Sequence, residues 1–138
     1  MSQSAAQVRE VMTTDPAVVS PDDTLERAWA MMTGEGYRHL PVVKDGQLVG
    51  VLSITDIGRL GATVPSLMAR TVGEWMTKNP ITVGPDEPVE RAAGQMGLHK
   101  VNCLPVVTGG KLVGIVTTYD LLDALARQLG PRSTRNLP

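Results

Sequence analysis

The chain has 138 residues, of which 42% are hydrophobic and 20% charged, and its formal net charge is −1 at pH 7. General nucleic-acid binding needs a basic surface, so this charge argues against a DNA- or RNA-binding protein. No apolar stretch approaches the roughly 18 residues of a membrane-spanning helix. The N-terminus lacks the regions of a signal peptide, and the single cysteine, Cys103, fits a reducing compartment. We therefore expect a soluble, cytoplasmic protein that binds neither nucleic acid nor membranes.

The first predicted elements are a short strand at residues 17–19 and an amphipathic helix. The helix starts after Pro21 and its acidic neighbours, which the helix dipole favours there. Apolar residues at helical spacing extend over residues 25–32. Gly34 and Gly36 end the helix.

A β-hairpin and a second helix complete the unit. Residues 40–43 and 48–52 are apolar runs on either side of an Asp-Gly pair at 45–46, the strongest local signal for a hairpin turn. The helix that follows is interrupted by Gly58 and Gly61. The predicted order is therefore strand, helix, strand, strand, helix.

The whole unit then occurs a second time. Residues 72–121 repeat residues 8–57 without a gap, each position 64 residues further on. The identical positions include Met12-Thr13 and Met76-Thr77, Pro16 and Pro80, Leu40-Pro41-Val42-Val43 and Leu104-Pro105-Val106-Val107, Gly50 and Gly114, and Asp56 and Asp120. A unit of about 60 residues buries only about 60% of its unfolded surface, so the two copies are expected to share a core.

This repeat divides the chain into four predicted segments. The first repeat covers 8–60, a connector covers 61–71, and the second repeat covers 72–129. Its last helix should stop at Gly130, because Gly followed by Pro ends helices. Residues 130–138 are polar and are predicted to be a disordered tail.

In order, spacing and duplication these motifs resemble a tandem pair of cystathionine β-synthase (CBS) domains, also called a Bateman module. The motifs are Met-Thr-x-x-Pro, Leu-Pro-Val-Val, the glycine hairpin, and Gly-h-h-[Ser/Thr]-x-x-Asp with h apolar. The resemblance implies an α+β fold of two β-α-β-β-α repeats, packed with pseudo-two-fold symmetry around two clefts. It also implies a homodimer and an adenosine ligand such as AMP, ADP, ATP or S-adenosylmethionine.

The resemblance also assigns residues to the two clefts. In site A, Asp56 would bind the ribose, Ser53 and Thr55 the ribose or phosphate, and Arg38 the phosphate. The adenine in site A would lie against Thr77, Pro80, Thr82, Val101 and Asn102. In site B the corresponding set would be Asp120 and Thr117, with Thr13, Pro16, Val18, Tyr37 and Tyr119 around the ligand.

The second repeat departs from the family pattern. Tyr119 replaces the hydroxyl residue matched by Thr55, and Asn102 stands where Arg38 stands in the first repeat. Site A is therefore the preferred cleft, whereas site B is either empty or different in preference.

Simpler readings exist for the same residues. Asp56 and Asp120 suit the first turn of a helix through its dipole, and Ser53 and Thr117 suit helix N-caps. His99 and Cys103 form no compact set of metal ligands, so we predict no metal site.

Three functions compete at this stage. The preferred one is a stand-alone, non-catalytic nucleotide sensor with an unknown protein partner. The second is a structural dimerisation module with degenerate clefts. The third, an enzyme, has no supporting catalytic motif, and we predict no catalytic residue.

Overall fold

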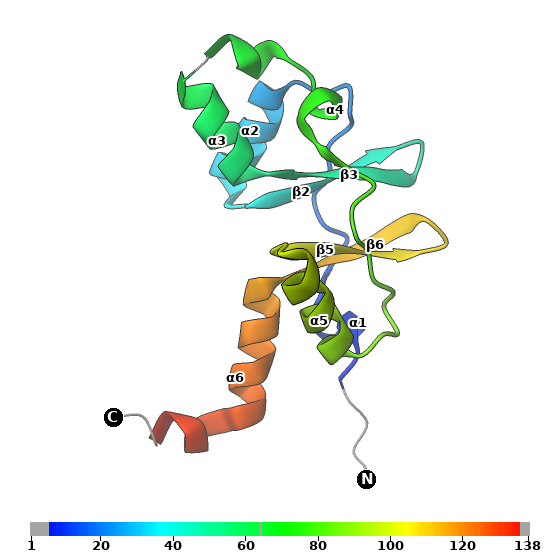
Figure 1. Ribbon diagram of the computed structural model, residues 1–138, viewed down its shortest axis with the longest axis vertical. Coiled ribbons are helices and arrows are strands. Elements are labelled where there is room, and N and C mark those ends of the chain that lie inside the picture. The colour runs from blue at the N-terminus through cyan, green and yellow to red at the C-terminus, as the bar shows by residue number, and fades with distance from the viewer. Residues whose placement is uncertain (1–5, 64, 136–138) are drawn as a thin grey trace.

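The protein consists of two lobes stacked along its long axis (Figure 1). This computed structural model describes residues 6–63 and 65–135, with side chains at 6–58 and 66–128. Each lobe contains a three-stranded sheet, in which all neighbouring strands are antiparallel. The fold is therefore α+β with two repeats, as the sequence predicts.

Most of each repeat stays within one lobe. The first lobe contains α2 (Leu25–Glu35), β2 (His39–Lys44), β3 (Gln47–Ser53), α3 (Ile54–Thr63) and the 3-10 helix η1 (Pro65–Ala69). The second lobe contains α5 (Val89–His99), β5 (Cys103–Thr108), β6 (Lys111–Thr117) and α6 (Thr118–Arg135).

The opening segment of each repeat belongs to the opposite lobe. The segment with α1 (Val8–Val11) and β1 (Thr13–Thr14) joins the second lobe, where β1 pairs with β6. The segment with α4 (Val72–Trp75) and β4 (Thr77–Lys78) joins the first lobe, where β4 pairs with β3. The resemblance already groups the opening segment of each repeat with the Ser/Thr-x-x-Asp turn of the other repeat. The pairing of β1 with β6 and of β4 with β3, which ties the two lobes together, was not predicted.

The strand predicted at 17–19 is not formed, and neither is a strand at 81–83, the same positions in the second repeat. Each segment makes one parallel bridge instead, Val19 with Val42 and Val83 with Val106. Val19 donates its N–H to Pro41 O at 3.1 Å and accepts from Val43 N–H at 2.9 Å. Pro21 follows two residues later and has no N–H with which to continue a ladder, so the pairing ends after one bridge.

The predicted apolar faces form two buried clusters. In the first lobe, Leu25, Ala28 and Met32 of α2 pack with Leu40 and Val42 of β2. The exchanged segments complete both clusters, since Val72 lies in the first and Val8 in the second, each 0% exposed. The exchange is thus part of each hydrophobic core, a contribution of about 1.5–3 kcal/mol for each fully buried valine.

The hairpin prediction is confirmed in both repeats. Asp45 and Gly46 have φ of 51° and 79°, and Gly109 and Gly110 have φ of 59° and 81°. Positive φ at both central positions is the requirement of a type I′ turn. The two hairpins also meet, because Leu48 donates its N–H to Gly110 O at 3.3 Å.

Two helix predictions need correction. Helix α3 is continuous from Ile54 to Thr63, although Gly58 and Gly61 were expected to interrupt it. Gly58 instead allows close packing, since a Cβ there would lie 3.2 Å from the Trp29 ring. Helix α6 continues past Gly130 to Arg135 and bends in its last turns (Figure 1). The segment 130–135 is thus helical, not a disordered tail, and 136–138 lie outside the described residues.

Within the described ranges, none of the helices has both the length and the apolar character needed to cross a bilayer.

Candidate functional site

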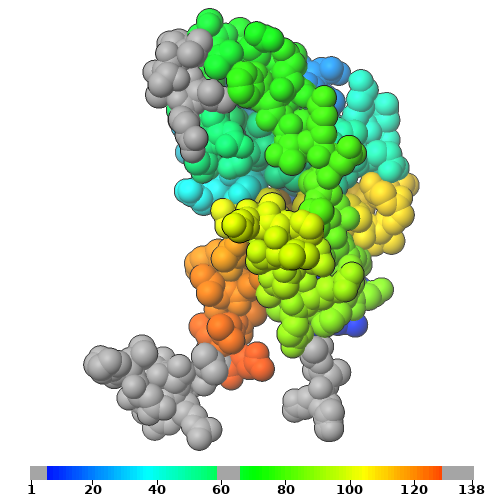
Figure 2. Space-filling model, in the orientation of Figure 1, coloured from blue at the N-terminus to red at the C-terminus, as the bar shows by residue number. Residues whose placement is uncertain are grey.

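A cavity of about 560 Å³ lies where the two lobes meet. In the space-filling view, the cyan surface of the first lobe borders the yellow and orange surface of the second (Figure 2). The cavity is lined by the segment from β1, the loop before β2, the turn from β3 into α3, Asn102 before β5, and the last part of β6 with the start of α6. Its volume lies within the range of about 300–1,000 Å³ typical of small-molecule sites.

The cavity brings together residues predicted for both sites. From site B it contains Thr13, Pro16, Tyr37, Thr117 and Tyr119, and from site A it contains Arg38, Ser53, Thr55 and Asn102. The other predicted residues do not line it: Val18 and Asp120 of site B, and Asp56, Thr77, Pro80, Thr82 and Val101 of site A. The structure thus places Arg38 on the wall of the cleft that the second repeat's Thr117 turn helps to form.

Backbone hydrogen bonds hold the walls of the cavity in place. Ile54, the first residue of α3, donates its N–H to Arg38 O at 2.9 Å. Thr118, the first residue of α6, donates its N–H to Asn102 O at 2.9 Å in the same way. Each bond satisfies a free N–H at a helix start and fixes the backbone of a cavity residue.

Asp120 serves as a helix cap. Its Oδ2 accepts a hydrogen bond from Thr117 N–H at 2.8 Å, and its own N–H donates to Thr117 Oγ1 at 3.2 Å. This reciprocal arrangement is a capping box for α6. The prediction that Thr117 is a helix N-cap is therefore confirmed, and Oδ2 of the Asp120 carboxylate takes part in the cap.

Six lining residues of the cavity were not predicted from the sequence, and two of them, Asp15 and His39, have ionisable side chains. Asp15 lines it from the segment after β1, and His39 lines it beside Arg38. A usable signal existed for Asp15, because it lies inside the Met-Thr-x-x-Pro motif. For His39, the neighbouring Arg38 was the available signal.

His39 has a lowered pKa, chiefly because burial disfavours its charged form and secondly because Arg38 repels it; Asp56 acts in the opposite direction. The imidazole is therefore neutral at pH 7. It offers one hydrogen-bond donor and one acceptor to a ligand.

The cavity combines aromatic, cationic and hydroxyl groups. The sequence contains two tyrosines, and both line the cavity, Tyr37 at 38% and Tyr119 at 75% exposure. Arg38 supplies a cation, and Thr13, Ser53, Thr55, Thr117 and Thr118 supply hydroxyls. These groups suit a ligand that has a flat ring, hydroxyl groups and an anionic end.

The sulfur chemistry of Cys103 is suppressed. The side chain is buried in β5, and burial raises the pKa of its thiol to about 12. The thiol is therefore protonated at neutral pH and behaves as a small apolar group. Among the described residues, no three His, Cys, Asp or Glu side chains gather into a group that could hold a metal ion.

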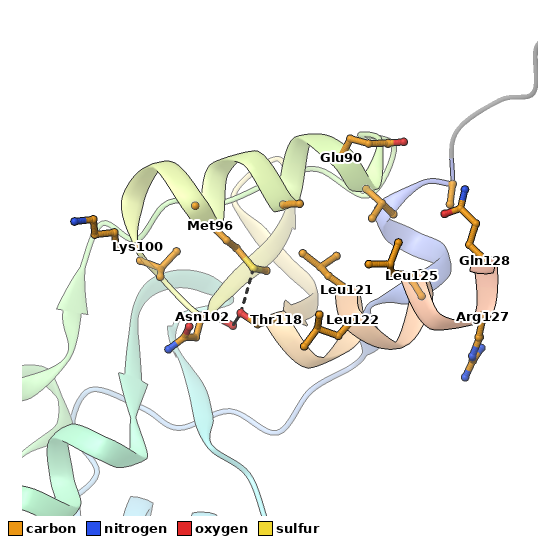
Figure 3. Close-up of a pocket in the computed structure, with 16 residues that line it drawn as sticks. Glu90, Met96, Lys100, Asn102, Thr118, Leu121, Leu122, Leu125, Arg127 and Gln128 are labelled. Atoms are coloured by element: carbon orange, nitrogen blue, oxygen red, sulfur yellow. Dashed lines mark hydrogen bonds between the residues drawn. The ribbon is translucent and has the colours of Figure 1, made fainter. Parts of the chain in front are cut away.

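A second, larger groove of about 1260 Å³ lies between α5 and α6. Its wall is mainly apolar, with Met96 from α5 and Leu121, Leu122 and Leu125 from α6 (Figure 3). Val101 and Asn102, both predicted for site A, also line it. Leu122 and Leu125 are 59% and 51% exposed, so this groove presents an apolar face at the surface.

Comparison with known proteins identifies the repeats. The CBS domain family matches residues 8–60 and 72–127. YhcV, a CBS domain-containing protein of Bacillus subtilis, is 35% identical over 117 residues, which make up 84% of this chain and 83% of that protein. Other curated relatives are longer, and the chain spans about a quarter of their length. One is an inosine-5'-monophosphate dehydrogenase of Korarchaeum cryptofilum, 34% identical over 99% of this chain and 27% of that protein.

Solved structures match over both lobes. CBSX2 of Arabidopsis thaliana in complex with AMP is 30% identical, with a TM-score of 0.79 over 90% of this chain and 98% of that one. The CBS domain pair of protein MJ0100 was solved in complex with 5'-methylthioadenosine and S-adenosyl-L-methionine. It is 28% identical, with a TM-score of 0.80 over 91% of this chain and 99% of that one. The chain therefore belongs to the CBS domain family, as a tandem pair of CBS domains.

Proposed function

We propose that this CBS pair is a non-catalytic regulatory module that binds an adenine nucleotide in the cavity between its lobes. The observation that carries the proposal is the composition of that cavity, where both tyrosines lie with Arg38 and several hydroxyl side chains. The single cysteine, Cys103, is free, which agrees with the proposed reducing, cytoplasmic location.

Each part of a nucleotide has a suitable partner in the cavity. Tyr37 and Tyr119 supply aromatic surface for adenine. Arg38 suits a phosphate, because a guanidinium binds phosphate oxygens through paired N–H groups. His39 adds a neutral donor beside it. These groups favour AMP, ADP or ATP over S-adenosylmethionine, whose sulfonium is cationic.

Two related proteins support this class of ligand, since CBSX2 was solved with AMP and the MJ0100 pair with 5'-methylthioadenosine and S-adenosyl-L-methionine. The remaining site A residues, which include Asp56, Thr77 and Pro80, stay a prediction for a second cleft related by the repeat.

A ligand in this cavity would touch both lobes, so its binding can change how the lobes are arranged. Lining residues come from the first lobe, from the second, and from the exchanged β1 segment. Binding shifts the arrangement of the lobes only by the difference between the ligand's affinities for the two arrangements. The output is an altered contact with a partner protein.

The first prediction is ligand-induced stabilisation. AMP at about 100 times its Kd should raise the free energy of unfolding by about 2.7 kcal/mol, because it binds the folded chain alone. A thermal-shift panel with AMP, ADP, ATP, GMP, S-adenosylmethionine and NAD measures this on purified protein. A flat panel from protein free of co-purified nucleotide would reject the sensor and leave the structural interaction module.

We further propose that the chain forms a homodimer through the groove between α5 and α6. The argument rests on the exposed leucines of α6, since Leu122 and Leu125 are more than half exposed beside the buried Met96. Apolar faces of this kind mark protein interaction sites, and a second copy offers the same apolar face in a two-fold arrangement.

The second prediction tests this surface. Leu125→Glu should convert a dimer into a monomer, because a carboxylate would be buried without a partner in the interface. Light scattering after size-exclusion chromatography gives the mass. Leu98→Glu is the matched control, because Leu98 is 72% exposed on α5 but does not line the groove. A parent that elutes as a monomer, or a dimer that survives Leu125→Glu, would contradict the assignment.

A further inference from the structure

We propose that the inter-lobe cavity selects a nucleoside monophosphate over the corresponding di- and triphosphate, because its wall carries one cation and one carboxylate. This selectivity rests on the proposed nucleotide function and names the ligand class within it. It follows from the charges on the cavity wall and from the way the two repeats contribute to that wall.

The two charged side chains of the wall cancel each other. Within the described part of the chain, Arg38 and Asp15 are the only lining residues that carry a formal charge at pH 7. His39 lines the cavity beside Arg38, but its lowered pKa keeps the imidazole neutral. Arg38 is therefore the single cation that this wall offers to a phosphate.

Both charges are open to a ligand. Arg38 and Asp15 are exposed, and neither forms an ion pair with any residue that the structure describes. One guanidinium binds one phosphate through paired N–H groups, and that phosphate brings a charge of about −1.5 to −2 at pH 7. Each further phosphate adds negative charge without a second cation on the wall, and the Asp15 carboxylate repels it.

The two helix starts beside the cavity add little further attraction. A helix start attracts anions through its dipole and its free N–H groups. At α3, the Ile54 N–H already donates to Arg38 O at 2.9 Å. At α6, the Thr117 N–H donates to Asp120 Oδ2 at 2.8 Å, so a carboxylate oxygen already lies at that helix start and offsets its dipole.

The repeat shows where a second cation is missing. Asn102 occupies the position of Arg38 in the second repeat, and both residues line this cavity. The same is true of Ser53 and Thr117, so the cavity spans equivalent positions of the two repeats. An arginine at residue 102 would supply the second cation that a polyphosphate needs, whereas this chain has an uncharged amide there.

The carboxylate on the wall comes from one repeat only. Asp15 lines the cavity, whereas Asn79, its counterpart in the second repeat, does not. The two residues have nearly the same φ, 50° and 49°, a left-handed conformation that Asp and Asn both tolerate. Asp15→Asn therefore removes the negative charge from the wall without changing the backbone conformation.

Isothermal titration of the full chain with AMP, ADP and ATP, in the absence of magnesium, tests this selectivity. The parent should bind AMP about 10- to 100-fold more tightly than ATP, because like charges held close together at a binding surface are costly; ADP should lie between them. Asn102→Arg should lower this ratio about tenfold, and Asp15→Asn should lower it in the same direction. The bond from Thr118 N–H to the residue 102 carbonyl uses only the backbone, so Asn102→Arg should keep the cavity wall.

Asp22→Asn is the matched control, because it changes the net charge by the same amount at an exposed residue outside the cavity. It should keep the parent's ratio, and an equal fall in this variant would assign the effect to the overall charge of the chain and overturn the proposal. A parent that binds ATP as tightly as AMP, or a ratio that neither Asn102→Arg nor Asp15→Asn lowers, would also overturn the selectivity while nucleotide binding itself remains. A parent that binds none of the three nucleotides would instead refute the proposed function.

Discussion

Gly114→Ala should lower the free energy of unfolding by about 1–3 kcal/mol, the usual cost of adding a methyl group to a well-packed core. It should also weaken nucleotide binding. A Cβ at Gly114 would lie 2.6 Å from Met12 Sδ and 2.9 Å from Thr13 O. The methionine can move, but the carbonyl belongs to β1, which pairs with β6 at this position. The substitution therefore forces the exchanged segment away from the cavity that it lines. Urea unfolding followed by circular dichroism measures the stability, and titration with AMP measures the binding.

Two glycine variants serve as controls. Gly50→Ala meets the equivalent atoms in the first lobe, Met76 Sδ at 2.6 Å and Thr77 O at 2.8 Å, so it should cost similar stability without displacing β1. Gly94→Ala lies in α5 with nothing within 4 Å and should stabilise the protein by about 0.4–1 kcal/mol. A Gly114→Ala variant as stable as the parent would contradict the close approach of β1 to Gly114 of β6. If Gly50→Ala weakens AMP binding as strongly, the exchanged β1 segment has no special role.

Arg38→Asn should weaken AMP binding about 10- to 100-fold, the equivalent of about 1.5–3 kcal/mol for a hydrogen bond to a charged group. Asparagine is the residue at this position in the second repeat. The bond from Ile54 N–H to the residue 38 carbonyl uses only the backbone, so the variant should keep the wall of the cavity. Titration with AMP and with adenosine separates the two ends of the ligand, because adenosine lacks the phosphate and should bind both proteins equally.

The matched control for Arg38 is Lys44→Asn, which removes an exposed cation at the far end of β2. It should leave AMP affinity unchanged, since Lys44 does not line the cavity. Equal losses from both variants would mean that AMP responds to the overall charge of the chain. Equal losses of AMP and adenosine from Arg38→Asn would assign Arg38 to the nucleoside and not to the phosphate.

The sequence alone determined the elements whose signals are local. Asp45-Gly46 and Gly109-Gly110 specify their turns through positive φ, and the helical spacing of Leu25, Ala28 and Met32 specifies a buried face, so both were predicted correctly. The duplicated motifs identified the family for the same reason, since order and spacing are properties of the chain and need no coordinates.

Only the tertiary structure decided which repeat builds which lobe. Strands β1 and β4 have two residues each, too few for an alternating pattern to reveal their partners. Their pairing depends on contacts across the molecule, such as the approach of Thr13 to Gly114. This exchange places Arg38 and Asp15 in the same cavity.

The roles of the acidic residues depended on the structure in the same way. The motif marks Asp120 equally as a candidate ligand and as part of a helix cap, and the 2.8 Å bond from Thr117 N–H shows that its Oδ2 takes part in the cap. The sequence signal for Asp15 is its place inside the Met-Thr-x-x-Pro motif, directly before the proline. Spacing along the chain predicts which residues share a face, whereas hydrogen bonding and packing between distant segments decide which side chains remain free to meet a ligand.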